Sequence, residues 1–171
     1  MTAGTRSENL AQGWRAAIEQ GVGADASASW ASSDAVRNVM RANKSRDTDP
    51  ELALRRAVHA LGLRYRVNRR PDPSIRRTAD LVFAGPKVAV FLDGCYWHGC
   101  PEHYRPASKN AEFWSQKIDG NRARDVETDR LLQAAGWTVV RVWEHEDPRV
   151  AADRIAEVVL RGAMPLPSPG V

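Results

Sequence analysis

Two short apolar runs rich in β-forming residues lie close together near the middle of this chain of 171 residues. They cover 79–83 and 87–92, and only Ala84-Gly85-Pro86 separates them. Two such runs joined by a turn-forming stretch predict a β-hairpin. A third run, 137–143, predicts a buried strand with Trp137 and Trp143 in the core, and 65–68 is a candidate for a shorter strand. We therefore expect a small sheet.

Helical segments alternate with these strands. Thr48-Asp49-Pro50-Glu51 is a helix start, because it combines a capping residue, proline in the first turn and Glu51 three residues after Thr48. Residues 111–135 predict a long helix that ends before Gly136, and 149–160 predict a final amphipathic helix. The order helix, strand, hairpin, helix, strand, helix is typical of an α/β domain with a mixed sheet flanked by helices.

The length of the chain suits one domain with an appendage at each end. We expect an N-terminal extension over 1–33, partly flexible, in which a short helix at 9–20 precedes a small-residue linker at 21–33. The domain is expected to span 34–162, and the proline-rich tail, 163–171, to be disordered. No apolar run approaches the roughly 18–20 residues that cross a bilayer, and the N-terminus lacks a signal core. We therefore expect a cytoplasmic protein without membrane contact.

Positive charge is concentrated in one part of the sequence. The net charge is +4, but residues 35–77 alone hold twelve basic and four acidic side chains, nearly all of the basic ones arginine. A basic block of this kind is typical of a protein that binds phosphate backbones. A solvated surface that keeps the protein soluble is the alternative.

A cluster of metal-binding residue types follows the second strand of the hairpin. Cys95, Cys100 and His103 form a C-x4-C-x2-H motif, and His145 comes just after the strand at 137–143. In a cytosolic chain, two cysteines this close indicate a metal site rather than a disulfide. Two thiolates and two imidazoles suit tetrahedral zinc, and four protein ligands indicate a structural site. Glu102 and Glu146 are alternatives for the fourth ligand.

Acidic residues stand at matching ends of the predicted hairpin. Asp80 opens the first strand and Asp93 ends the second, so both carboxylates can converge on one divalent ion. Such oxygen ligands are those that Mg²⁺ prefers, and Glu51 is a candidate for a third. Each acid also has a structural explanation: Glu51 completes a capping box, and Asp93-Gly94 favours a turn.

His98 and three aromatic residues flank the cysteine motif. Imidazole has an ordinary pKa of about 6.5, so it can deprotonate water or protonate a leaving oxygen. Zinc ligation in place of His103 is the alternative role of His98. Tyr96, Trp97 and Trp114 can stack on bases or wedge between them. That role requires them to be partly exposed on the side of the domain that holds Asp80, whereas burial in the core is the alternative.

Several ordered motifs run through the second half of the chain. They are the segment 93–103 (DGCYWHGCPEH), the segment 110–121 (NAEFWSQKIDGN), Arg124-Asp125, and the segment 136–144 (GWTVVRVWE). With the upstream segment 37–48 and Glu51, they resemble the very short patch repair (Vsr) endonucleases. The likeness runs from about residue 34 to residue 155.

The resemblance implies a variant of the PD-(D/E)xK nuclease fold, α/β with a mixed β-sheet flanked by helices, and a structural zinc site. Members of this family use Mg²⁺ to nick DNA beside a T:G mismatch, the product of 5-methylcytosine deamination. The expected partners are therefore double-stranded DNA and, through a functional link, a cytosine-5 DNA methyltransferase.

Carried over by position, the resemblance makes Asp80 the metal-binding aspartate, with the backbone carbonyl of Leu92 beside it, and His98 the catalytic histidine. Asp93 stands where some members carry a second histidine, which favours metal binding there, and His145 stands where a cysteine often completes the zinc site. The expected catalytic residues are Asp80, His98, Asp93 and Glu51; the Mg²⁺ ligands are Asp80, Leu92 and Asp93; the Zn²⁺ ligands are Cys95, Cys100, His103 and His145; the DNA contacts are Tyr96, Trp97, Trp114, Lys117 and Asn121.

Two other functions remain open at this point. One is a restriction-type or modified-DNA nuclease on the same scaffold, because of the departures from the family pattern and the N-terminal extension. The other is an inert zinc-bearing DNA-binding module, which the presence of Asp80 and His98 opposes.

Overall fold

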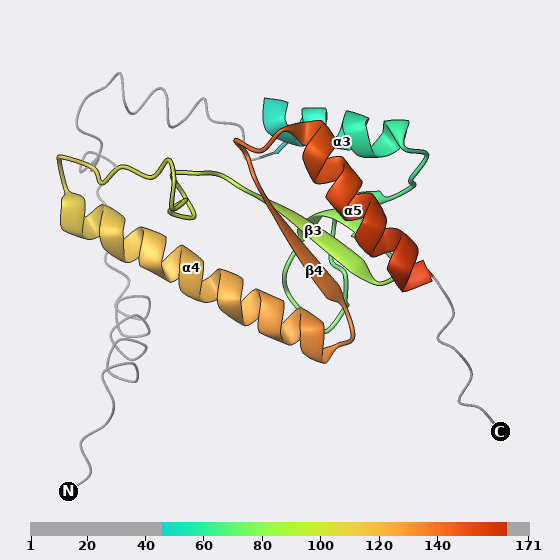
Figure 1. Cartoon of the computed structure of the whole chain (residues 1–171). Coiled ribbons are helices and arrows are strands. Elements are labelled where there is room, and N and C mark those ends of the chain that lie inside the picture. Colours follow the sequence, from blue (N-terminus) through green and yellow to red (C-terminus); the bar gives the residue numbers. More distant parts are fainter. Residues whose placement is uncertain (1–45, 164–171) are drawn as a thin grey trace, which may run out of the picture. The chain divides into compact units, whose positions relative to one another are not determined.

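The computed structural model describes residues 46–163, and these form a four-stranded sheet with helices on both faces (Figure 1). The predicted extension, 1–33, and all but the first residue of the predicted tail lie outside the described residues. The elements follow in the order α3 (Asp49–Ala60), β1 (Arg66–Arg69), β2 (Ala79–Phe83), β3 (Val88–Asp93), α4 (Ala111–Ala134), β4 (Thr138–Trp143) and α5 (Pro148–Ala163). The predicted sequence of helices and strands is confirmed.

The sheet has the order β1-β2-β3-β4 and is mixed, as expected. β1, β2 and β3 pair antiparallel, whereas β3 and β4 pair parallel from Val88↔Thr138 to Asp93↔Trp143. The parallel pair requires a crossover, and α4 provides it. The predicted hairpin is therefore the β2–β3 pair, which lies inside the sheet rather than at its edge.

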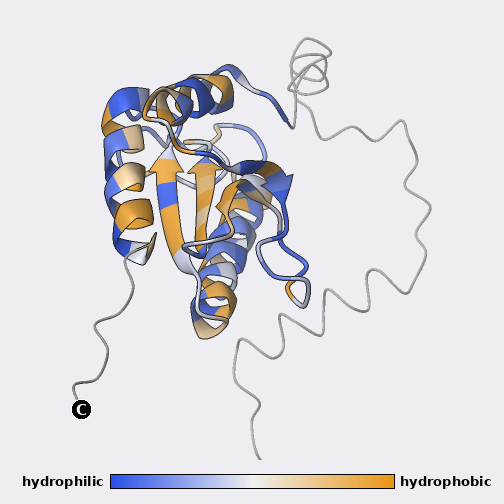
Figure 2. Ribbon diagram, turned by 90° about the vertical axis from the view of Figure 1, so that its right-hand side faces the viewer, coloured by the Kyte–Doolittle hydropathy of each residue, from blue (hydrophilic) through white to orange (hydrophobic). Residues whose placement is uncertain are grey.

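Two apolar layers cover the two faces of the sheet. On one face, Leu54 of α3 and Ile155 of α5 pack with Leu81 and Val90 of the strands. On the other, Leu132 of α4 packs with Val82 and Ala89. Figure 1 shows α3 and α5 on one side of β3 and β4 and α4 on the other, and Figure 2 shows the apolar strands enclosed between polar outer helix faces. Because both faces are covered, β2 and β3 are nearly continuous apolar runs.

The ends of the elements differ from the prediction in two instructive places. Thr48 precedes α3 with an extended backbone but makes no side-chain capping bond; Glu51 reaches back instead, and its Oε2 accepts from the Asp47 N–H at 3.0 Å. Trp137 is buried, as predicted, but Trp143 is only half-buried. None of the helices within 46–163 is long and apolar enough to cross a membrane.

Candidate active site and metal centre

Asp80 and Leu92 bring two kinds of oxygen ligand together where β2 begins and β3 ends. The Leu92 N–H donates to Asp80 Oδ2 at 2.8 Å. The regular β2–β3 ladder starts only at Leu81↔Val90, so the Asp80 carboxylate takes the place of a backbone acceptor. In a strand, the N–H and C=O of one residue point to the same side, and the Leu92 carbonyl therefore also faces Asp80. This is the pair of groups that the family resemblance implies.

Nearby positive charge does not fully compensate the negative charge of Asp80. Its pKa is raised to about 6: burial contributes most to this rise, the negative charges of Glu51 and Asp93 add to it, and the Leu92 N–H opposes it. Burying an anion near two other carboxylates costs free energy unless a cation compensates it. The chemistry of this site fits a hard divalent cation, which carboxylate and carbonyl oxygens hold.

Glu51 lies near Asp80 but is fully engaged at the start of α3. Its Oε1 accepts from Thr48 Oγ1 at 3.1 Å, and its Oε2 accepts from Arg55 Nη2 at 2.7 Å. The capping explanation of Glu51 is therefore confirmed in part. Its catalytic role stays a prediction, supported by the influence of its charge on Asp80.

Asp93 is buried, and both of its carboxylate oxygens accept hydrogen bonds from Arg141 Nη1, at 2.9 and 2.8 Å. Burial raises the pKa of Asp93, and the Arg141 guanidinium opposes that rise. An aspartate whose two oxygens already bind a cation competes poorly for a second one. The geometry thus favours an ion-pair role over the expected metal ligation.

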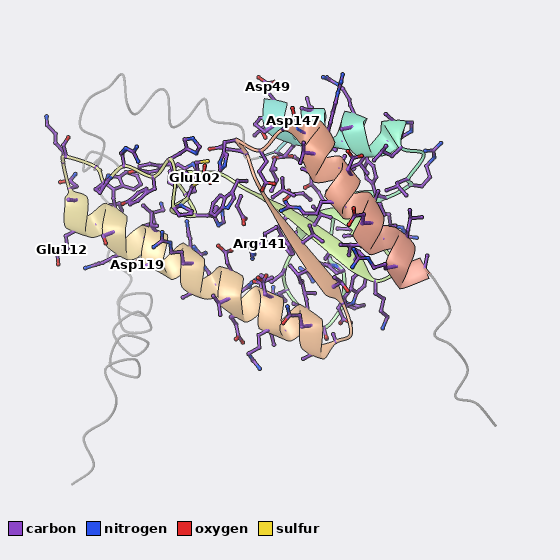
Figure 3. All side chains as sticks on the ribbon, viewed as in Figure 1. Asp49, Glu102, Glu112, Asp119, Arg141 and Asp147 are labelled. Carbon is purple, nitrogen blue, oxygen red and sulfur yellow. The ribbon has the colours of Figure 1, made fainter. Side chains whose placement is uncertain are left out.

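Arg141 lies in the space between β4 and α4 (Figure 3) and contacts three aspartates. Its Nε donates to both carboxylate oxygens of Asp129 at 3.1 Å, and its Nη2 lies 3.3 Å from Asp125 Oδ1. Its guanidinium carbon lies 5.1 Å from the centre of the Phe91 ring. Burial works against the charge of Arg141, but the bonds to Asp129 and Asp93 raise its pKa above the usual range.

His98 is held by a carboxylate of α4. Its Nδ1 lies 2.6 Å from Asp125 Oδ2 and 3.6 Å from Asp93 Oδ1. An ionised carboxylate only accepts, so Nδ1 carries a proton and, in the neutral ring, Nε2 has the free lone pair. His98 is therefore not a member of the cysteine cluster, and its predicted alternative as a zinc ligand is wrong.

One stretch of α4 also holds the backbone of the loop that carries His98. Asn121 Nδ2 donates to the Trp97 carbonyl at 2.7 Å, and Arg122 Nε donates to the His98 carbonyl at 3.2 Å. Arg122 also donates to the carbonyl of Gly99, whose φ of +61° lies in the left-handed region that favours glycine. Asn121, expected to contact DNA, is thus engaged within the protein.

The cysteine and histidine side chains meet in one cluster. The donor atoms of Cys95, Cys100, His103 and His145 all lie within 4.8 Å of one another. The Sγ–Nδ1 distances are 3.1 Å for Cys95–His145, 3.7 Å for Cys100–His145 and 3.8 Å for Cys100–His103. Tetrahedral zinc, with bonds of about 2.3 Å to sulfur and about 2.0 Å to nitrogen, sets sulfur–nitrogen separations of about 3.5 Å. The donor set fits zinc.

The neighbouring glutamates do not join this donor set. Glu102 Oε2 lies 3.6 Å from His145 Nε2, the ring nitrogen opposite the cluster, which is the position of an orienting partner. Glu146 is occupied elsewhere, since it accepts from the Trp143 N–H and from Arg154. Burial and the Cys100 thiol raise the pKa of Cys95 to about 11. For Cys100, burial is outweighed by the N–H groups of His103 and Glu102, which lower its pKa.

The three aromatic residues form one cluster but differ in exposure. The ring centroids of Tyr96, Trp97 and Trp114 lie 5.4–5.9 Å apart in edge-to-face contacts. Tyr96 and Trp97 are half-buried, whereas Trp114 is only 5% exposed. The expected partial exposure of Trp114 is wrong, because the other two rings cover it. Lys117 Nζ lies 5.7 Å from the ring centres of both Trp97 and Trp114.

Comparison with known proteins identifies the family to which this chain belongs. The family model described as DNA mismatch endonuclease Vsr matches residues 32–103. The type II nicking enzyme V.NaeI of Lentzea aerocolonigenes is 45% identical over 122 residues, which cover 70% of this chain and 72% of that protein. The chain belongs to the Vsr family.

Other members of the Vsr family are similarly related. The type II nicking enzyme V.NmeDIP of Neisseria meningitidis is 46% identical over 112 residues, 64% of this chain and 74% of that protein. The DNA mismatch endonuclease Vsr of Escherichia coli K12 is 37% identical over 107 residues, 61% of this chain and 66% of that protein. As a Vsr family member, the chain is a DNA endonuclease.

Among solved structures, the catalytic domain of the homing endonuclease I-Bth0305I matches with a TM-score of 0.48 and 17% identity, over 69% of this chain and all of that domain.

Three polar residues of this Vsr family site were not predicted from the sequence. Asp125 was noted only within a family motif, and Arg141 and Arg122 were given no role. Positions 121, 122 and 125 lie on one face of a helix, and this spacing could have indicated that their side chains act on the same neighbouring segment. Arg141 offered only an arginine in the interior of an otherwise apolar strand, which indicates a buried charge and therefore a buried partner.

Proposed function

We propose that this protein is a Mg²⁺-dependent endonuclease that nicks one strand of duplex DNA next to a T:G mismatch. One observation carries the catalytic part: the half-buried Asp80 carboxylate, whose pKa is raised to about 6, faces the Leu92 carbonyl side of β3. The mismatch part rests on membership in a family whose model is described as a DNA mismatch endonuclease. We propose the PD-(D/E)xK variant of the mixed-sheet fold on the same ground.

In this proposal, Asp80 and the Leu92 carbonyl hold Mg²⁺. The ion supplies positive charge that polarises the scissile phosphate and stabilises the charge that develops as the P–O bond breaks. Asp93 is left out of the ligand set because Arg141 occupies both of its oxygens. Glu51 adds negative charge beside the site without leaving its place at the start of α3.

His98 is proposed to move a proton through Nε2. Asp125 binds Nδ1 at 2.6 Å, which orients the ring and directs Nε2 away from α4. The same arrangement of carboxylate and imidazole prepares histidine bases in many hydrolases. In the nicking reaction, the imidazole assists either attack by water or departure of the leaving oxygen.

The zinc cluster is proposed to be structural. With four protein donors it has no open position for a substrate. It ties the loop from 93 to 110 to the turn after β4, where His145 lies. Because that loop also carries His98 and two of the aromatic residues, zinc holds the catalytic and recognition groups in one place.

Recognition is proposed to combine aromatic insertion with phosphate contacts. A mispair stacks more weakly than a matched pair, so inserting Tyr96 and Trp97 costs less free energy there. Arginines of the basic block supply contacts that position the duplex without specifying its sequence. Since T:G mispairs arise by deamination of 5-methylcytosine, we also propose a functional link to a cytosine-5 DNA methyltransferase.

A second candidate function is site-specific nicking that does not depend on a mismatch. It is favoured by the names of the relatives at 45% and 46% identity, which are type II nicking enzymes. The inert zinc-bearing module is not favoured, because Asp80 and the His98–Asp125 pair are both present.

The deciding experiment is a nicking assay on duplexes that differ in a single base pair. Matched, T:G and 5-methylcytosine-containing duplexes are incubated with the full chain, with Mg²⁺ or with EDTA. Nicking of the T:G duplex only, and only with Mg²⁺, is the expected result. Equal nicking of the matched duplex favours the second candidate, and no nicking of any duplex contradicts both.

A further inference from the structure

Arg141 is a half-buried cation at the point where β3, β4 and α4 meet. Its side chain is 23% exposed, and all three of its nitrogens are engaged: Nη1 with Asp93, Nε with Asp129, and Nη2 with Asp129 and with the backbone carbonyl of Asp125 at 3.3 Å. A charged group is retained at such a place only when its partners compensate for the lost hydration. Here the partners are the residues that surround His98.

The contacts form a chain that leads from Arg141 to the imidazole. Arg141 Nη2 lies 3.3 Å from Asp125 Oδ1, and the other oxygen of the same carboxylate lies 2.6 Å from His98 Nδ1. Arg141 Nη1 also fixes Asp93, whose Oδ1 lies 3.6 Å from the same ring nitrogen. Both carboxylates that face His98 therefore take their positions from one guanidinium.

We propose that Arg141 is a positioning residue for DNA nicking: by holding Asp93 and Asp125 together, it fixes the orientation of His98. This inference rests on the proposed role of His98 in the endonuclease reaction. Arg141 touches neither substrate nor metal in this scheme. It acts only through the two aspartates.

Two physical reasons require a guanidinium at this position. Without a cation, Asp93, Asp125 and Asp129 would repel one another at close range in a partly buried site, and Asp125 would move away from His98. The aspartates also lie in different directions around a planar fork of donors. A lysine ammonium is a single point charge, so it can compensate for part of the negative charge but cannot hold all three carboxylates in place.

The charge balance has a further consequence for Asp93. Once Arg141 is removed, both Asp93 oxygens become available on β3, next to Leu92. A free carboxylate there competes with Asp80 for a divalent cation. By occupying both Asp93 oxygens, Arg141 keeps Asp93 out of the ligand set proposed for Mg²⁺.

The test compares Arg141→Lys and Arg141→Gln with the wild-type full chain, on whichever duplex the wild type nicks. Arg130→Lys is the matched control, because Arg130 is an exposed arginine of α4 whose only ion pair within residues 46–163 is with Glu127. The readouts are the single-turnover nicking rate at saturating protein, the DNA affinity, the folded fraction by circular dichroism, and the NMR signal of the His98 Nδ1 proton, assigned with His98→Gln.

We expect Arg141→Lys to lower the single-turnover rate by about 100-fold, the size that follows from small misplacement of a catalytic group. DNA affinity should change less than about threefold, since the phosphate contacts are intact. The His98 Nδ1 proton signal, sharp and downfield in the wild type through its bond to Asp125, should weaken or disappear. Arg130→Lys should match the wild type in all four readouts.

Three results overturn the proposal. One is a rate for Arg141→Lys within threefold of the wild type. Another is a loss of rate that the folded fraction accounts for completely, including failure of both variants to fold, which shows a purely structural role. The third is an unchanged His98 Nδ1 signal despite a slow reaction. Failure of the proposed function is seen separately, as absence of nicking by the wild type or as full activity of His98→Gln.

Discussion

Asp80 has opposite effects on function and on stability. Its folded-state pKa of about 6 lies above the value of 3.8 for an unperturbed aspartate. Between these two values, the folded state binds more protons than the unfolded state, so the stability of the metal-free protein falls as the pH rises through this window. Above about pH 6, Asp80 is charged in both states, and the loss in the free energy of unfolding reaches its maximum. A bound cation would restore that free energy by compensating the charge.

The first prediction concerns Asp80→Asn in metal-free protein at pH 7.5. Asparagine keeps an acceptor for the Leu92 N–H but removes the half-buried charge, so the free energy of unfolding should rise, by at most about 3 kcal/mol for a pKa raised from 3.8 to about 6. Nicking should be lost, with DNA binding retained. Thermal melts and the nicking assay measure both. Asp119→Asn, at an exposed acid of α4 (Figure 3), is the control and should change neither. A variant that nicks normally would show that Asp80 is not the metal ligand.

The second prediction follows from the same pKa. Metal binding requires the charged form of Asp80, so protons compete with Mg²⁺ below about pH 6. The Mg²⁺ concentration for half-maximal nicking should rise about tenfold per pH unit below that point and level off above it. Nicking is measured across Mg²⁺ concentrations from pH 5 to pH 8. A constant half-maximal concentration over this range would contradict the assignment.

The third prediction separates two members of the aromatic cluster. Trp97 is half-buried and Trp114 is buried, so only Trp97 has a face available for bases. Trp97→Ala should weaken binding to the T:G duplex by about 1–3 kcal/mol and leave binding to the matched duplex nearly unchanged. Trp114→Phe should mainly lower the melting temperature. The affinities of Trp97→Ala for both duplexes and the melting temperature of Trp114→Phe test this prediction. Equal loss on both duplexes would contradict mismatch insertion by Trp97.

At the scale of elements, three arginines of the basic block lie on the edge strand β1 and at the start of the loop that follows it. Arg66, Arg69 and Arg70 are exposed and line an open groove of about 470 Å³. Within residues 46–163, none of these three takes part in an ion pair. Arg69 pairs in register with Ala79, the residue before Asp80. The edge therefore begins beside the proposed metal site and runs away from it.

The fourth prediction tests this edge by its salt dependence. Arg66 and Arg69 lie about 10 Å apart along β1, three residues at about 3.3 Å each. Each phosphate contact contributes about 0.9 to the slope of log affinity against log salt. The double variant Arg66→Gln/Arg69→Gln should lower that slope by nearly two, equally for matched and T:G duplexes. The control, Arg56→Gln/Arg149→Gln, makes the same charge change at exposed arginines of α3 and α5. Equal slopes for the two double variants would exclude the β1 edge as the backbone contact.

At the scale of the whole molecule, the loop from 93 to 110 depends on contacts from other elements. The cluster of Cys95, Cys100, His103 and His145 joins it to the residues after β4, and α4 holds the backbone of Trp97, His98 and Gly99. A loop of this length without strands or helices needs such contacts to keep one conformation.

The fifth prediction concerns metal content. Freshly purified protein should hold about one equivalent of zinc, and Cys100→Ser should lose the zinc and much of the stability, because metal binding contributes to the free energy of folding. Elemental analysis and thermal melts measure this. His59→Ser is the control, because His59 lies exposed on α3 and outside the cluster. Protein purified without chelators that contains no zinc would contradict the structural site.

Much of this protein follows from the sequence alone. The hairpin, the long helix before Gly136 and the start of α3 were predicted because apolar periodicity, glycine and capping residues act over a few neighbouring positions. The C-x4-C-x2-H spacing predicted a cluster that the structure brings together, since three of its donors lie within nine residues of one another. The positions of Asp80 and Asp93 at one end of the hairpin follow from antiparallel pairing.

Only the tertiary structure decided which of these groups are available for chemistry. Asp93 is bound by Arg141 from β4, His98 is oriented by Asp125 from α4, and Trp114 is covered by aromatic residues of the loop. Each contact joins residues that are 17 to 48 positions apart. Sequence spacing predicts partners within one turn of a helix or across one hairpin, whereas a buried charge takes its partner from whichever element the packing of the two helical layers places beside it.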